Sequence, residues 1–360
     1  MSAPTAAVIG AGVISEICHL PGYVREGFRV VALCDVDQAK AEKLATRFPV
    51  ERVYTDWRHM LETERPDVVS VCTPNALHEE QVIAALEHGA HVLCEKPLAT
   101  SAPAAERMFA AARRAGRWLM AAQSHRFTPE ATAAKEIVDT GRLGFVYDAE
   151  ALVWSRLGLP GRGVFHRRAL SGGGVLLDNG VHVLDQALWL MGGPRAVGVT
   201  AVTGRYFGHR PEIVEVAPGE WNPEEFDVED FAVAFVRLEG GRSLTLRAAW
   251  AAHLDEAAPL RTRLLGTEAG LTTVPFMVCG IADGALYDEV RDDLPPDRRF
   301  ELEMAHWASV VRGETEPLVR EEETLTVLRV LDAAYQSARE QREVVIASPS
   351  TTDGVARAAG

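Results

Sequence analysis

The sequence lacks any apolar run near the roughly 18 residues that a membrane-spanning helix needs, and no basic leader with an apolar segment opens it. These absences predict a cytoplasmic protein with no membrane partner.

Positively charged residues are also scarce, because 37 Lys and Arg stand against 51 Asp and Glu and leave a net charge of −14. Binding to nucleic acid requires a basic face, so nucleic acid is not expected as a partner. With 360 residues, 47% of them hydrophobic, the chain is long enough for two cores.

Cysteine and lysine are scarce as well. The five cysteines form no Cys-x-x-Cys pair, so neither a disulfide framework nor a thiolate zinc site is expected. Only four lysines occur, at positions 40, 43, 96 and 135, while arginine is abundant.

Lys96 stands at the end of an apolar run, inside the motif Glu95-Lys96-Pro97. Because proline stops a strand, the ammonium group is expected at the rim of a sheet. Lysine is also the cation whose pKa shifts readily on burial. Lys96 is therefore the first candidate for a chemical group, and the alternative is a surface lysine that merely closes a strand.

A glycine motif near the start of the chain indicates a dinucleotide site. Residues 5–9 are predicted as a strand, and Gly10-Ala11-Gly12-Val13-Ile14-Ser15 follows. Two glycines allow a tight turn and a close approach to a pyrophosphate, while Ser15 is small enough for the third position. Asp35, after a second predicted strand, can accept from ribose hydroxyls and would repel a 2′-phosphate. NAD is therefore expected, with NADP as the alternative.

Strands and helices then alternate, which predicts a doubly wound parallel sheet of the Rossmann type over residues 1–123. In such sheets ligands bind beyond the carboxyl ends of the strands. The side chains of Asn75 and His78 contact the cofactor or only cap the next helix, and the sequence leaves both readings open. The residues expected to contact the cofactor are Gly10, Gly12, Val13, Ile14, Asp35, Thr73, Pro74, Asn75, His78, Glu95 and Lys96.

The pattern changes near residue 124, and a second constellation follows. A helix over residues 175–191 is predicted to carry Asp178, His182 and Asp185 on one face. An aspartate one turn before a histidine can orient the imidazole and raise its basicity for proton removal. Two alternatives are a core histidine and a metal site. Three ligands on one helix make a poor closed metal site, so no metal is expected.

A loop rich in arginine and glycine precedes that helix. It carries Arg156, Arg162, His166, Arg167 and Arg168 and ends in Ser171-Gly172-Gly173-Gly174. The glycines allow a ligand or another backbone to come close. The cations either close over a polar or anionic substrate or are simply solvated. The residues expected to contact substrate are Lys96, Arg126, Arg156, His166, Asp178 and His182; the alternative for Arg126 is an ion pair with a surface acid.

The remainder, residues 124–348, is predicted as an α+β domain with a large, mainly antiparallel sheet. Residues 204–227 and 280–299 are predicted as connections without regular structure, and residues 349–360 as a disordered tail. One face of the sheet is expected to be free of helices. Since an open apolar face is usually an oligomer interface, a homodimer or homotetramer is expected.

Together these motifs resemble the Gfo/Idh/MocA family, named for glucose-fructose oxidoreductase and inositol dehydrogenase. The resemblance runs from Gly10-Ala11-Gly12 through Glu95-Lys96-Pro97 to Asp178-x-Gly180-x-His182-x-x-Asp185. It implies an NAD(P)-dependent oxidoreductase acting on CH-OH groups, with Lys96, Asp178 and His182 as the catalytic set.

The expected reaction is hydride transfer between nicotinamide and a carbinol carbon of a sugar, cyclitol or sugar derivative. His182, oriented by Asp178, would take the hydroxyl proton, and Lys96 would bind the same oxygen. The alternative is an NAD-retaining glycoside-cleaving or lyase-type enzyme that uses transient oxidation with no net redox change.

Overall fold

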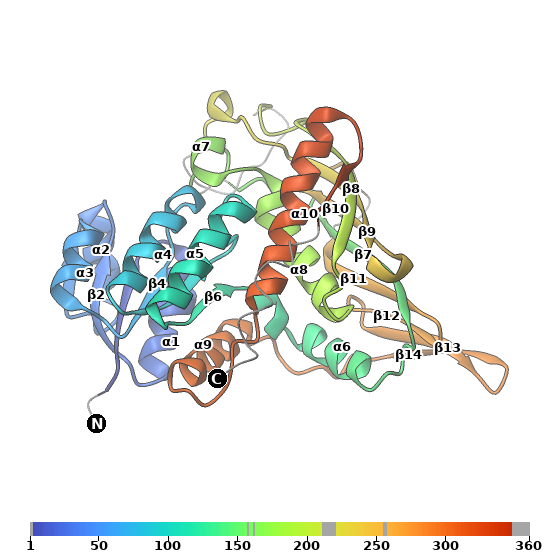
Figure 1. Cartoon of the computed structure of the whole chain (residues 1–360), viewed down its shortest axis with the longest axis horizontal. Helices are drawn as coiled ribbons and strands as arrows, with labels where there is room; N and C mark the ends of the chain where they lie inside the picture. Colours follow the sequence, from blue (N-terminus) through green and yellow to red (C-terminus); the bar gives the residue numbers. More distant parts are fainter. Residues whose placement is uncertain (1–2, 157, 161–162, 211–220, 255–257, 348–360) are drawn as a thin grey trace, which may run out of the picture.

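The computed structural model describes residues 3–156, 158–160, 163–210, 221–254 and 258–347. Its described part contains two sheets that lie side by side with helices between and around them (Figure 1). The predicted tail at 349–360 and Arg162 lie outside the described residues.

The first sheet has six parallel strands in the order β3-β2-β1-β4-β5-β6. Strands β1, β4 and β6 are almost fully buried because helices cover both faces, as expected for near-continuous apolar strands, whereas the edge strand β3 is partly exposed. The bounds are β1 Thr5–Ile9, β2 Arg29–Cys34, β3 Arg52–Tyr54, β4 Val68–Val71, β5 His91–Glu95 and β6 Leu119–Ala122; η1 Ser15–His19, α1 Leu20–Arg25, α2 Gln38–Ala45, α3 Trp57–Glu64, η2 Asn75–Leu77, α4 His78–Glu87 and α5 Ala102–Ala115.

The second sheet has nine strands in the order β14-β13-β12-β11-β7-β10-β9-β8-β15. It is antiparallel except for the pair β7 and β10. The strands are β7 Val146–Trp154, β8 Ala196–Gly204, β9 Phe231–Leu238, β10 Arg242–Ala249, β11 Ala258–Gly266, β12 Ala269–Thr272, β13 Met277–Ala282, β14 Ala285–Val290 and β15 Val344–Val345. This confirms the predicted fold class.

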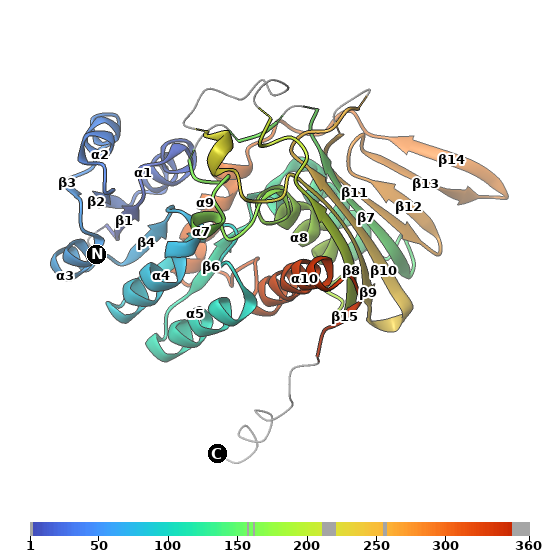
Figure 2. The same ribbon diagram turned by 90° about the horizontal axis from the view of Figure 1, so that it is seen from above.

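Helices cover one face of the second sheet, while the other face carries none of the described helices (Figure 2). The helices of this half are η3 Ser124–Phe127, α6 Pro129–Asp139, α7 Arg168–Ser171, η4 Leu176–Gly180, α8 Val181–Leu190, η5 Pro223–Glu225, η6 Glu239–Gly241, α9 Arg299–Val311 and α10 Glu321–Glu340. The single helix predicted over 175–191 is thus a π-helical turn, η4, that continues into α8.

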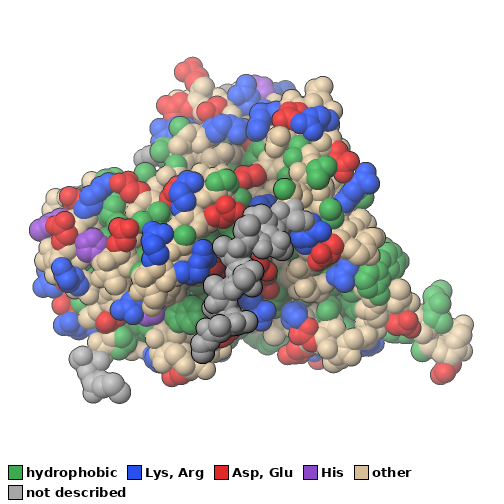
Figure 3. Space-filling model, viewed as in Figure 1, with side chains coloured by type: hydrophobic (Ala, Val, Ile, Leu, Met, Phe, Trp, Pro, Cys, Tyr) green, Lys and Arg blue, Asp and Glu red, His purple; other side chains and the backbone are tan. Residues whose placement is uncertain are grey.

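The prediction of an irregular connection over residues 280–299 was wrong in its first half. Strands β13 and β14 form a hairpin that projects from the body, and hydrophobic side chains are visible on it (Figure 3). Its two-residue turn is Asp283-Gly284, with φ of +52° and +77°. Positive φ at both positions matches a primed hairpin turn, and Asp-Gly is a strong sequence signal for one.

Helix α9 comes late in the chain but packs against the first sheet's layer of helices. A Cβ on Gly22 of α1 would lie 2.4 Å from Cγ of Met304, so glycine at this position lets the two helices approach closely. Arg25 also donates to Glu301 at 3.3 Å. A helix from the C-terminal part of the chain therefore packs on the helices that cover the N-terminal sheet.

Candidate functional site

The glycine turn after β1 has the shape that a dinucleotide site requires. Gly10 has φ +102°, and a Cβ there would lie 2.4 Å from the carbonyl oxygen of Cys72. Gly12, in contrast, has open space where a Cβ would stand. The Ser15 hydroxyl donates to the Gly10 carbonyl at 2.6 Å, so the residue that departs from the glycine pattern closes the same turn.

Asp35 directly follows β2, beside this turn. Its carboxylate accepts from the backbone N–H of Ala11 at 2.7 Å and of Asp37 at 3.0 Å, and Lys40 Nζ lies 3.8 Å away. Val13 is exposed next to the turn. An open glycine, an exposed apolar residue and a fixed carboxylate at the strand end fit the pyrophosphate and ribose of a dinucleotide.

The loop after β4 is tied to its neighbours by side chains. His78 has Nε2 2.9 Å from the Thr73 carbonyl and Nδ1 3.1 Å from the Pro97 carbonyl, and burial lowers its pKa. The Asn75 amide donates to the Ser171 carbonyl at 2.7 Å, which links the loop to α7. Both side chains therefore fix Thr73 and Pro74 beside the loop that follows β5.

Lys96 stands just past β5, as predicted, and it contacts the second half of the chain. Its Nζ donates to Oδ1 of Asp178 at 2.8 Å and to the Asp178 carbonyl at 3.1 Å. The other carboxylate oxygen of Asp178 accepts from Nε1 of Trp250 at 3.0 Å. Asp178 thus holds Lys96, which differs from the predicted pairing of Asp178 with His182.

His182 follows one turn later, with neighbours that the sequence did not suggest. Its ring centroid lies 4.4 Å from that of His125, and Arg299 Nη1 lies 3.0 Å from both ring nitrogens of His125. Burial, followed by the interaction with His125 and the positive charges of Lys96 and Arg299, holds the pKa of His182 well below its usual range. Burial and Arg299 likewise lower the pKa of His125 to about 3. Among the described residues, Nδ1 of His182 is buried without a hydrogen-bond partner.

Three of these contact residues were missed from the sequence. His125 lies directly after β6, so the rule that strand ends meet at one rim could have found it. Trp250 and Arg299 reach the site from β10 and α9 through tertiary packing, which no local pattern shows.

The carboxylate of Glu95 joins a buried polar chain. Its Oε1 lies 3.0 Å from Nε2 of His19, and Nδ1 of His19 lies 2.8 Å from Oγ of Ser70. The hydroxyl of Tyr23 is 2.7 Å from the same Ser70 oxygen. Glu303 of α9 is buried nearby, and burial followed by the charge of Glu95 raises its pKa to about 8.

The arginine-rich loop reaches Lys96 through an aromatic ring, since Phe165 has its centroid 5.9 Å from Nζ. The Arg167 and Arg168 guanidinium groups lie 3.5 Å from Glu225 and 3.6 Å from Glu229. His166 is buried, with Nε2 3.8 Å from Glu225. Arg156, by contrast, is exposed.

The triglycine segment makes room for protein backbone. A Cβ on Gly174 would lie 1.9 Å from the Glu229 carbonyl oxygen, and one on Gly173 would lie 2.1 Å from the Tyr335 hydroxyl. The Glu229 carboxylate accepts from Gly174 N at 2.9 Å and from the Tyr335 hydroxyl at 2.7 Å. The sequence allowed either a ligand or another backbone to come close to these glycines, and in the structure it is another part of the protein.

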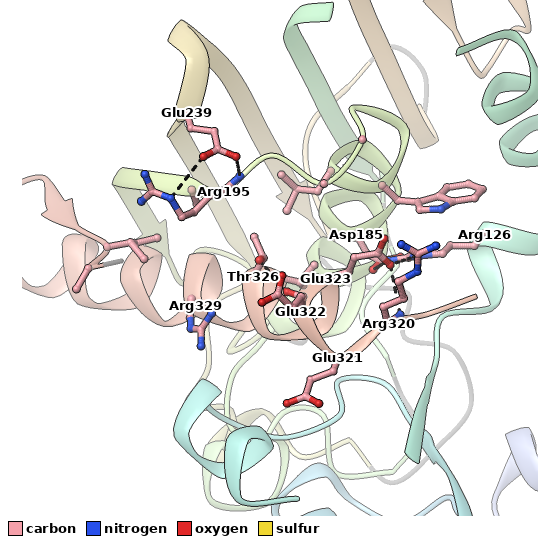
Figure 4. Close-up of a pocket in the computed structure, with 18 residues that line it drawn as sticks. Arg126, Asp185, Arg195, Glu239, Arg320, Glu321, Glu322, Glu323, Thr326 and Arg329 are labelled. Atoms are coloured by element: carbon pink, nitrogen blue, oxygen red, sulfur yellow. Dashed lines mark hydrogen bonds and ion pairs between the residues drawn. The ribbon is translucent and has the colours of Figure 1, made fainter. Parts of the chain in front are cut away.

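Arg126 is buried in an ion-pair cluster. It donates two hydrogen bonds to Asp185 at 2.7 and 2.8 Å and one to Glu323 at 2.6 Å. Figure 4 shows these residues along a pocket between α8 and α10, where Arg195 also pairs with Glu239. Lys96, Asp178 and His182 do not line this pocket, so it is separate from the site at the strand ends.

In the described part of the chain, no cluster of three or more His, Cys, Asp and Glu side chains is arranged to hold a metal ion. None of the described helices is long and apolar enough to span a membrane.

Two family models match the chain. Residues 5–123 match an oxidoreductase family with an NAD-binding Rossmann fold, and residues 131–272 match the GFO/IDH/MocA C-terminal domain.

Two similar proteins are named as dehydrogenases of a glucoside and of a sugar. D-glucoside 3-dehydrogenase of Escherichia coli K12 is 33% identical over 92% of this chain and 94% of its own length. An NADP-dependent D-xylose 1-dehydrogenase of Haloferax volcanii is 30% identical over 92% of this chain and 96% of its own. The crystal structure of an aldose-aldose oxidoreductase from Caulobacter crescentus superposes with a TM-score of 0.77 at 25% identity, covering 96% of this chain and 100% of that one.

Proposed function

Because the chain belongs to the Gfo/Idh/MocA family of NAD-binding oxidoreductases, we propose that it oxidises a ring hydroxyl of a neutral sugar or glycoside with NAD. The observation that carries this proposal is the Lys96–Asp178 ion pair, which stands next to His182 at the carboxyl ends of the first sheet. The similarity to D-glucoside 3-dehydrogenase supports a glycoside as the first substrate class to test.

The turn at Gly10 to Ile14 and the Asp35 carboxylate would hold NAD, with Thr73 and Pro74 beside them. When bound, NAD supplies the hydride acceptor. Lys96 would donate a hydrogen bond to the substrate oxygen and stabilise the negative charge that develops as the proton leaves. His182, which is neutral because of its lowered pKa, would accept that proton. Asp178 would hold the Lys96 ammonium group in place.

A neutral substrate is favoured by the pairing of three arginines, two in the loop and one on α9. Arg167 and Arg168 each face a glutamate, and Arg299 donates to Asp297 at 2.7 Å. Charge that is already balanced attracts an anionic substrate weakly. Sugar acids are therefore expected to be poorer substrates than neutral glycosides.

We also propose that two or four copies assemble through the open face of the nine-stranded sheet. Val202, Phe235 and Leu265 are exposed on this face by 60%, 44% and 37%. Light scattering after size-exclusion chromatography should give the mass of a dimer or tetramer, and Phe235→Glu should lower the measured mass.

The five free cysteines support a reducing compartment such as the cytoplasm.

The proposed function is tested by absorbance at 340 nm with NAD and a panel of glucosides, free sugars, inositols and uronic acids. NADH formed with neutral glycosides or sugars would support the proposal. Cleavage of a glycoside without accumulation of NADH would contradict it and favour chemistry with transient oxidation.

A further inference from the structure

The carboxylate of Asp178 is held from two sides. Lys96 Nζ bonds one oxygen at 2.8 Å, and the indole N–H of Trp250 bonds the other at 3.0 Å. Trp250 directly follows β10 and is 1% exposed, and its backbone N–H donates to the Asp230 carbonyl at 3.0 Å. The indole is therefore fixed by both its packing and its backbone.

An indole N–H is a donor only and carries no charge at any pH. It can therefore stabilise the ionised carboxylate without accepting a proton from Lys96. A buried donor also loses free energy when it has no partner, so Trp250 and Asp178 stabilise each other. The charge of Lys96 acts on both His182 and His125, and these two histidines are kept neutral by their lowered pKa values.

We propose that Trp250 is a positioning residue for the reaction. By holding Asp178 it prevents rotation of the carboxylate, and through Asp178 it fixes the Lys96 ammonium group where the substrate oxygen binds. This inference rests on the proposed function for the place of the substrate. The Trp250–Asp178–Lys96 geometry itself is independent of the substrate's identity.

The test is Trp250→Phe, which keeps an aromatic ring and removes the N–H donor. Loss of a hydrogen bond to a charged group should lower kcat about tenfold or more, while KM for NAD stays constant.

Trp154→Phe is the matched control. Trp154 ends β7 beside β10, and its indole nitrogen has no hydrogen-bond partner among the described residues. Its replacement should leave both kcat and KM for NAD unchanged. If Trp250→Phe does not fold, benzothienylalanine placed at position 250 keeps the ring shape and still removes the donor.

A second readout needs no substrate. Reductive methylation followed by mass spectrometry reports each of the four lysines, so Lys40, Lys43 and Lys135 serve as internal controls. Lys96 should react several-fold faster in Trp250→Phe, because a loosened carboxylate holds the ammonium group less firmly. Equal Lys96 labelling in Trp250→Phe and wild type would overturn the inference. Absence of any NADH from the wild type would instead contradict the proposed function, and the labelling would still test Trp250.

Discussion

Nε2 of His19 lies 3.0 Å from Oε1 of Glu95, which places a buried imidazole directly behind the residue that precedes Lys96. Burial alone would lower the pKa of His19, but the charges and hydrogen bonds of Cys72 and Glu95 raise it well above the usual value. A histidine on η1 is thus joined to the end of β5, so the helix after the glycine turn is coupled to the loop that carries Lys96.

Glu303 stands next to this pair and should make stability depend on pH. Its pKa is about 8 in the fold, against 4.5 for an exposed glutamate. The fold therefore favours its neutral form, and this contribution to stability is full below about pH 4.5 and is lost as pH rises through 8. Glu303→Gln should raise Tm relative to wild type more at pH 8.5 than at pH 5, as measured by thermal unfolding.

Glu301→Gln on the same helix provides the control for that experiment. Hydrogen bonds from Arg298 lower the pKa of Glu301, so its replacement should bring no gain at high pH. An equal shift in Tm at both pH values for Glu303→Gln would contradict the prediction.

Replacing Lys96 or His182 should stop turnover while cofactor binding persists. Lys96→Ala and His182→Ala should each lower kcat by about 100-fold or more, because each removes a group that handles the reacting oxygen or its proton. Initial rates at saturating NAD measure the effect, and calorimetry with NADH checks the binding. Near-normal rates in folded variants would show that other residues carry the chemistry.

The lowered pKa of His182 predicts the shape of the wild-type pH profile. Since the imidazole is neutral well below pH 6.5, oxidation should show no loss of rate between pH 7.5 and 6.5 from protonation of this residue. The log of kcat/KM plotted against pH gives the measurement. A drop centred near pH 6.5 that disappears in His182→Ala would refute this expectation.

Asp35 should set the preference between NAD and NADP. Asp35→Ser removes the charge that repels a 2′-phosphate and frees Lys40, which lies 3.8 Å from the carboxylate. The ratio of kcat/KM for NADP over NAD should rise by roughly 10-fold or more. In the double variant Asp35→Ser/Lys40→Ala that gain should shrink, and an unchanged ratio in the single variant would exclude Asp35 as the selector.

Gly174 should not tolerate a side chain. A Cβ there would fall 1.9 Å from the Glu229 carbonyl, so Gly174→Ala should destabilise the fold by about 1 to 3 kcal/mol or more. Urea unfolding measures this change. Gly270→Ala, whose Cβ would lie 3.3 Å from Cys279 Sγ, should cost much less.

The rim of the first sheet could be predicted from the sequence because it follows from local patterns. Strand ends in a parallel sheet meet at one edge, so the glycine turn, Asp35 and Lys96 were placed together correctly. The contacts of Asp178 could not be predicted in the same way. Helical spacing relates Asp178 to His182, but the packing of β10 and β5 against that helix decides that the carboxylate meets Trp250 and Lys96 instead. The β13–β14 hairpin was missed although its Asp283-Gly284 turn was visible, because acidic residues around it obscured the alternation.

The packing of α9 on α1 has a consequence for how the chain folds during synthesis. All six strands of the first sheet leave the ribosome long before residues 299–311 are made. Until then the surface around Gly22 that Met304 covers is open to solvent. Nascent chains that end before α9 should therefore bind chaperones and resist release, and expression of residues 1–123 alone should give a less soluble product than the full chain.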